Sequence, residues 1–66
     1  MLIKVNNQPV TLQSPYTLAH LLSQLEQADT GIALAVNRQI IKRSHWANHD
    51  LNDGDEITLI KATAGG

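Results

Sequence analysis

The sequence closes on two glycines, Gly65 and Gly66, and a carboxylate that follows them is the group best suited to do chemistry. Glycine has no Cβ, so this end can pass through a channel that a side chain would block. Residues 62–66 also lack the apolar surface needed to order themselves, and we expect a flexible tail. The tail directly follows an apolar run, residues 56–61, that predicts a β-strand. This arrangement suggests a carrier whose chemistry takes place in a partner's active site.

Two further groups of side chains contain residue types that could form a site, and neither is predicted to do so. His45 and His49 lie four residues apart with Asp50 adjacent, a spacing that puts both rings on one face of a helical turn. A metal site needs a third protein ligand, and the sequence has neither an HExxH motif nor a cysteine. Ser14, His20 and Asp50 lack a nucleophile-elbow pattern. We therefore predict solvated histidines, with no metal and no cofactor bound by this chain.

Composition restricts the functions open to a chain of 66 residues. Such a chain forms one domain, here residues 1–66, and buries only about 60% of its unfolded surface, which leaves little room for an internal active site. The net charge of −1, the pI near 6.2 and the scarcity of aromatic residues argue against nucleic acid as a partner. Because there is no cysteine, any sulfur that the chain handles must be held by the terminal carboxylate.

The first residues contain no basic start followed by a long apolar segment. We therefore expect neither a signal peptide nor a membrane span, and a cytoplasmic location. In isolation we expect a monomer.

The elements that must position the tail begin with two alternating runs, residues 2–5 and 10–13, divided by a polar cluster that contains Asn and Pro. They predict a β-hairpin with Ile3 and Val5 on one face and Leu2 on the other. Next, Thr17 is a suitable N-cap for an amphipathic helix that ends near Asp29. Gly31 can supply the left-handed turn that closes it. The apolar face of this helix comprises Leu18, Leu21, Leu22, Leu25 and Ala28.

The second half of the sequence predicts strands at 32–37 and 40–42, a helical turn within 43–50, a tight turn at 52–55 and the final strand. Trp46 is placed at the edge of the core because its indole N–H needs a partner if buried. A hairpin, a helix, two strands, a long turn and a strand then form one sheet across a single helix. We predict an α+β fold of the β-grasp (ubiquitin-like) kind, a mixed four- to five-stranded sheet on one main helix, with the final strand beside the first.

Alternation along the final strand predicts a docking surface on the outer face of the sheet. If Ile57 and Leu59 face the helix, then Ile60 faces away from it, as Leu2 does on the neighbouring first strand. An exposed apolar patch often marks a binding surface. Isolated apolar residues on the surface, with no binding role, are equally common.

Several motifs occur in order along the whole chain: Ala35-Val36-Asn37, Ile40-Ile41, Arg43 with Trp46, Asp53-Gly54-Asp55 and Ala64-Gly65-Gly66. With the length, they resemble the sulfur carrier proteins of thiamine biosynthesis, the ThiS family. The small subunit of molybdopterin synthase shares the fold and the Gly-Gly end, but it is usually longer and richer in phenylalanine, which this chain lacks. A ubiquitin-like protein modifier, or an interaction module with an inert tail, would also be consistent with a small domain that ends in two glycines.

The resemblance implies a protein co-substrate and not an enzyme. An E1-like activating enzyme would adenylate the Gly66 carboxylate with ATP, and a sulfur donor would convert the glycyl adenylate to a thiocarboxylate (1-thioglycine). A thiazole synthase would take this sulfur to build the thiazole ring of thiamine. Ala64 and Gly65 in the tail would contact these partners, as Ile60 and Leu2 would on the sheet.

Overall fold

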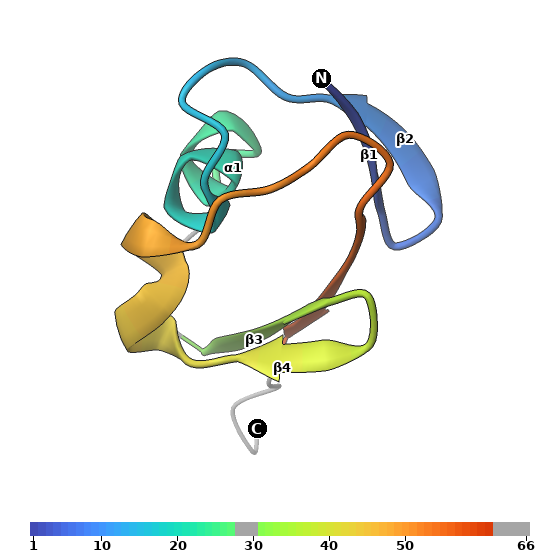
Figure 1. Ribbon diagram of the computed structural model, residues 1–66. Coiled ribbons are helices and arrows are strands. Elements are labelled where there is room, and N and C mark those ends of the chain that lie inside the picture. The colour runs from blue at the N-terminus through green and yellow to red at the C-terminus, as the bar shows by residue number, and fades with distance from the viewer. Residues whose placement is uncertain (28–30, 62–66) are drawn as a thin grey trace.

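Figure 1 shows a sheet that curves along one side of the molecule, with α1 and η1 on the other side. This computed structural model describes residues 1–27 and 31–61. Its elements are β1 (Leu2–Val5), β2 (Gln8–Thr11), α1 (Leu18–Gln24), β3 (Ile32–Val36), β4 (Gln39–Ile41), the 3-10 helix η1 (Arg43–Asn48) and β5 (Glu56–Lys61). The strand order is β2-β1-β5-β3-β4, so the last strand of the sequence lies in the centre. The predicted β-grasp arrangement is confirmed, and the sheet has five strands.

Each of the two hairpins turns on two residues in the left-handed conformation. Residues 6–7 and 37–38 have φ values of 50° to 71°. Positive φ at both central positions defines the type I′ turn, whose twist matches that of paired strands. Because these turns need only two residues, β2 begins at Gln8 and β4 at Gln39, earlier than the apolar runs predicted.

The first residue of each turn also binds β5 through its side chain. The Oδ1 of Asn6 accepts from the N–H of Leu59 at 2.9 Å, and its Nδ2 donates to the C=O of Leu59 at 3.2 Å. The Oδ1 of Asn37 accepts from the N–H of Glu56 at 3.0 Å, and its Nδ2 donates to the Asp55 carboxylate at 3.1 Å. The two amides therefore hold β5 near both of its ends, where it extends past a neighbouring strand.

Thr17 caps α1 as predicted. Its backbone is extended (φ −115°, ψ 159°), and its Oγ1 accepts from the N–H of His20 at 3.2 Å. This bond satisfies one of the N–H groups that the first turn of a helix leaves unpaired.

The C-terminal end of α1 corrects the sequence prediction. The helix ends at Gln24 and not near Asp29, which lies outside the described residues. Glu26 takes a positive φ of 57°, and the N–H of Gln27 reaches back to the C=O of Leu22 at 3.0 Å. These are the features of a Schellman motif, with glutamate where glycine is usual. Gly31 does have a positive φ, 72°, but it lies after the helix has closed.

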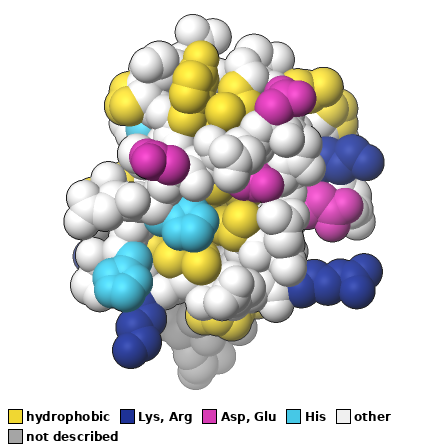
Figure 2. All heavy atoms as spheres, in the orientation of Figure 1, with side chains coloured by type: hydrophobic (Ala, Val, Ile, Leu, Met, Phe, Trp, Pro, Cys, Tyr) yellow, Lys and Arg dark blue, Asp and Glu magenta, His cyan; other side chains and the backbone are white. Residues whose placement is uncertain are grey.

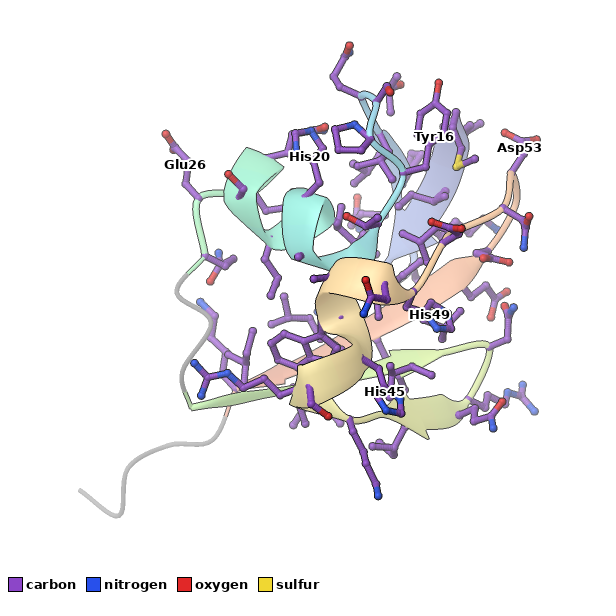
Figure 3. The ribbon with its side chains drawn as sticks, turned by 60° about the vertical axis from the view of Figure 1, so that its left-hand side comes forward. Tyr16, His20, Glu26, His45, His49 and Asp53 are labelled. Carbon is purple, nitrogen blue, oxygen red and sulfur yellow. The ribbon has the colours of Figure 1, made fainter. Side chains whose placement is uncertain are left out.

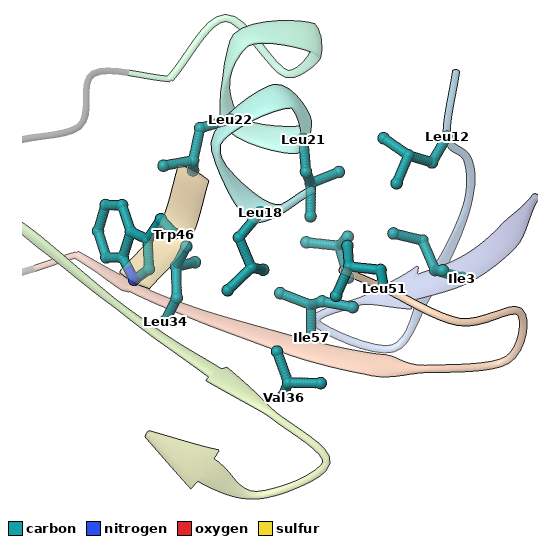
Figure 4. Close-up of a cluster of buried hydrophobic side chains, with 11 residues drawn as sticks. Ile3, Leu12, Leu18, Leu21, Leu22, Leu34, Val36, Trp46, Leu51 and Ile57 are labelled. Atoms are coloured by element: carbon teal, nitrogen blue, oxygen red, sulfur yellow. The ribbon is translucent and has the colours of Figure 1, made fainter. Parts of the chain in front are cut away.

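The core lies between α1 and the inner face of the sheet (Figure 4). Leu18 and Leu21 are fully buried, and Leu22 is nearly so. Ile3 and Val5 are buried while Leu2 is exposed, as the alternation predicted. Burial of each such side chain contributes about 1.5–3 kcal/mol, so this small core depends on few residues. The remaining buried apolar members of the cluster are Leu12, Leu34, Val36, Trp46, Leu51 and Ile57.

Trp46 is buried more deeply than its predicted place at the edge of the core implied, although it also lines an open hollow between α1 and η1. Only 4% of its surface is exposed. Its Nε1 donates to the C=O of Ile41 at 2.9 Å, which provides the partner that a buried indole needs. The turn from β4 into η1 brings this carbonyl within reach, and the sequence has no signal for that contact.

Substitution of Asn6 tests both of its roles. Asn6→Gly removes the two hydrogen bonds to Leu59 but accepts the positive φ, and we expect the free energy of unfolding to fall by about 1–2 kcal/mol. Asn6→Ala removes the same bonds and adds a side chain that disfavours positive φ, a further loss of about 1 kcal/mol. Urea unfolding followed by Trp46 fluorescence measures both. An alanine variant as stable as the glycine variant would contradict the role of the turn conformation.

Candidate functional site

The described chain leaves the sheet at its centre. β5 is parallel to β1, and the last pair between them is Val5 with Ile57. It is antiparallel to β3 from the pair of Val36 with Ile57 to the pair of Ile32 with Lys61. Lys61 is the last described residue, and the predicted site residues Ala64, Gly65 and Gly66 lie outside the described part, as does the predicted flexible tail, 62–66. The described chain therefore ends on a central strand that has neighbours on both sides at Ile57 and only β3 beside Lys61.

The two faces of β5 differ as the alternation predicted. Ile57 is buried, with 2% of its surface exposed, and Leu59 packs partly against the core. Ile60 points to the outer face and is 49% exposed. A large apolar side chain is therefore exposed to solvent next to Lys61, the last described residue.

Ile60 is part of an apolar patch that crosses three strands. It pairs with Ala33 on β3, and Ala35 on the same face of β3 pairs with Ile40 on β4. Ile40 is 63% exposed, the most of any large hydrophobic residue among those described. We call Ala33, Ala35, Ile40 and Ile60 the outer patch. Because alanine is short, the two isoleucines stand above the strand between them.

Leu2 shares this face, as predicted, but it does not join the outer patch. β1 and β5 run parallel with Lys4 beside Glu56, and Ile60 lies further along β5, whereas Leu2 lies before Lys4 on β1. The exposed charged residues Lys4 and Glu56 therefore separate Leu2 from Ile60. The sequence prediction missed Ile40. Its signal was the Ile40-Ile41 pair, since only one of two adjacent strand residues can face the core.

The histidines and carboxylates of the described ranges do not assemble into a site. Figure 3 shows His45 and His49 at η1, His20 on α1 and Glu26 just after α1. Within residues 1–27 and 31–61, no three His, Cys, Asp or Glu side chains lie close enough to hold a metal ion. On the face in Figure 2, acidic and basic side chains are scattered, without a continuous basic area. None of the helices in the described ranges is long and apolar enough to cross a membrane.

An open hollow lies between α1 and η1, on the side of the sheet opposite the outer patch. Among the described residues its lining includes the Ser23 hydroxyl but no carboxylate, histidine or thiol that could activate it as a nucleophile. The lining residues are Ala19, Leu22, Ser23, Gln27, Arg43, Trp46 and Ala47.

Comparison with known proteins agrees with this architecture. Residues 3–66 match the model of the ThiS family. The chain belongs to the ThiS family. It is 44% identical to the sulfur carrier protein ThiS of Escherichia coli (strain K12) over 66 residues, which is all of both chains.

Two solved structures of thiamine biosynthesis proteins have the same fold as this chain. The crystal structure of the thiamine biosynthesis protein (ThiS) from Geobacter metallireducens matches all of both chains with a TM-score of 0.82 and 25% identity. The solution structure of a thiamine biosynthesis protein from the same organism matches with a TM-score of 0.79 and 25% identity, over all of this chain and 88% of that one. The β-grasp fold is therefore common to this chain and its ThiS relatives.

The two isoleucines of the outer patch are exposed, whereas Ala35 beneath them is buried, so the isoleucines should be dispensable for folding. We expect Ile60→Lys and Ile40→Lys to change the free energy of unfolding by less than about 0.5 kcal/mol. The matched core change, Ile57→Ala, should lower it by about 2–4 kcal/mol because it leaves a cavity. Denaturant unfolding of the three variants measures this. If Ile60→Lys cost as much as Ile57→Ala, the patch would be part of the core.

Proposed function

We propose that this chain is a sulfur carrier of thiamine biosynthesis and that the Gly66 carboxylate carries the sulfur. The observation that supports this most strongly is the 44% identity to a sulfur carrier protein over all of both chains. That alignment extends through the Gly-Gly pair on which the chemistry depends. The two solved structures named for thiamine biosynthesis favour this pathway over that of molybdopterin synthase.

The chemistry needs activation because a carboxylate repels nucleophiles. Transfer of AMP from ATP to the Gly66 carboxylate releases pyrophosphate and gives an acyl adenylate with a good leaving group. A persulfide sulfur then displaces AMP, and attack by a second thiol on the resulting acyl disulfide releases the thiocarboxylate together with a disulfide. A thiocarboxylic acid is more acidic than a thiol, so at neutral pH it is ionised and nucleophilic, the state in which thiolate sulfur reacts.

The chain acts here as a co-substrate, and its partners supply the catalytic groups. An adenylating E1-like enzyme would use ATP, a sulfur donor would load the carrier, and a thiazole synthase would unload it. The absence of cysteine from the sequence supports this division, because no thiol of the chain itself can relay the sulfur. We propose that it works as a cytoplasmic monomer between these encounters.

The fold suits a part that must present one end to several enzymes. β5 is paired with β1 and β3 and is held by Asn6 and Asn37, so Lys61 starts the tail from a fixed point. Ala64 and Gly65 would lie in the partner's channel, where small side chains avoid a clash. The outer patch lies on the strands next to this starting point. We propose that it docks the activating enzyme, with Leu2 as a more distant contact.

The attachment site is tested by intact mass. Incubation with ATP and a thiamine-type activating enzyme should add AMP to the chain, and addition of a persulfide donor should replace one oxygen by sulfur. A variant with one residue appended after Gly66 should acquire neither AMP nor sulfur, and its thermal stability should equal that of the wild type. A product heavier by a whole protein would indicate a modifier instead. A wild-type chain that acquires no AMP would contradict the proposal.

Docking through the outer patch is tested by titration against the same activating enzyme. We expect Ile60→Lys and Ile40→Lys to weaken binding at least about tenfold, because each removes a buried apolar contact and places a charge at the interface. Leu2→Lys is the matched control on the same face, and its effect should be smaller because Lys4 and Glu56 separate it from the patch. An unchanged affinity of Ile60→Lys would remove the sheet face from the mechanism.

A further inference from the structure

One side of β5 loses its neighbouring strand before β5 ends. β1 pairs with β5 only as far as Val5 and Ile57. Beyond this point the N–H of Asn6 donates to the C=O of Ile57 at 2.9 Å, and the Asn6 side chain binds both backbone groups of Leu59. The Asn6 amide thus takes the place that the backbone of one more β1 residue would have beside β5. After Asn6 the chain turns back into β2.

The backbone groups of Lys61 point to this same side. In a strand, the N–H and C=O of residues i and i+2 face the same neighbour, and both groups of Leu59 face Asn6. On the β3 side, the N–H of Asn37 donates to the C=O of Glu56, so Glu56 and every second residue after it direct their backbone groups toward β3. Lys61 is not one of these residues, so its pair with Ile32 exchanges no hydrogen bonds. Lys61 therefore offers one donor and one acceptor to a strand that neither β1 nor β3 provides.

The other edges of the sheet are less suited to receive a strand. In β2, Pro9 is opposite Lys4, and this pair is next to the hydrogen-bonded pair of Val5 with Gln8 that closes the hairpin. The nitrogen of Pro9 therefore faces the open edge of the sheet, where it has no N–H to donate. β4 has only three residues, and short edges resist pairing. From Lys61 onward the sequence contains no proline, so every residue of that stretch keeps its N–H.

We propose that an extended segment of the activating enzyme adds to this edge as a short strand and pairs with the N–H and C=O of Lys61. The inference rests on the proposed function, because the edge belongs to the strand that leads to Gly66. Residues 62–66 are small and offer few side-chain contacts, so main-chain hydrogen bonds are the interaction by which a partner can hold this part of the chain. Asn6 sets the register, since it occupies Leu59 and leaves Lys61 as the first open position.

The test removes one N–H without disturbing the sheet. Lys61→Pro deletes the donor on the open side and spares the β3–β5 ladder, to which this N–H contributes nothing. Lys61→Ala is the matched control, which removes the charge and keeps the donor. In titrations with the activating enzyme we expect Lys61→Pro to bind about tenfold more weakly than wild type. Lys61→Ala should stay within about twofold, and thermal unfolding checks both folds.

Three results would overturn the inference. Equal weakening by proline and alanine would assign the contact to the lysine side chain, and no weakening by proline would exclude strand addition. A wild-type dimer in gel filtration that Lys61→Pro dissociates would assign the edge to a second copy of this chain.

If proline disturbs the fold, a synthetic chain with an ester in place of the Ile60–Lys61 peptide bond removes the same donor. If the wild-type chain is adenylated and the proline variant binds normally, strand addition is refuted and the proposed function stands. If the wild-type chain is never adenylated, the proposed function is refuted as well.

Discussion

The pairing of β5 with strands on both sides is the constraint on which the rest of this structure depends. The final strand joins the two hairpins, parallel to β1 and antiparallel to β3. Without it the hairpins would be separate two-stranded units, which are marginal in water on their own. Asn6 and Asn37 extend this pairing past the ends of the neighbouring strands. Folding therefore fixes the strand that leads to the reactive end.

The same strand divides the molecule into a stabilising face and a face free to bind. Ile57 completes the core beneath α1, while Ile60 lies in solvent with Ile40 beyond the alanines of β3. A chain of 66 residues has little apolar surface to leave exposed, because its core supplies only a modest margin of stability. Ile40 and Ile60 lie outside that core, which leaves them accessible for the docking role that we propose.

Small size also accounts for the division of labour. A core of this extent leaves little room for an internal nucleotide or metal site, and the described residues that line the hollow beside Trp46 include no carboxylate, histidine or thiol. A carrier of this kind can contribute a reactive carboxylate, a thin path to it and a surface for docking. The E1-like enzyme, the sulfur donor and the thiazole synthase would then contribute everything that requires a larger protein.

Local chemistry in the sequence was enough to predict the strand faces at Ile3 and Val5 and the Thr17 cap, because each depends on a few neighbouring residues and a simple period. The sequence also predicted the order of elements, and hence the β-grasp fold. Only the tertiary structure decided the contacts between distant segments. Strand register placed Ile40, across the alanines of β3, and not Leu2 in one patch with Ile60, and the Ile41 carbonyl satisfied the indole N–H of the buried Trp46. The Asn6 amide completed the edge of β5 across 53 positions of sequence. Such contacts depend on which strands meet and in which register, and no local pattern encodes that.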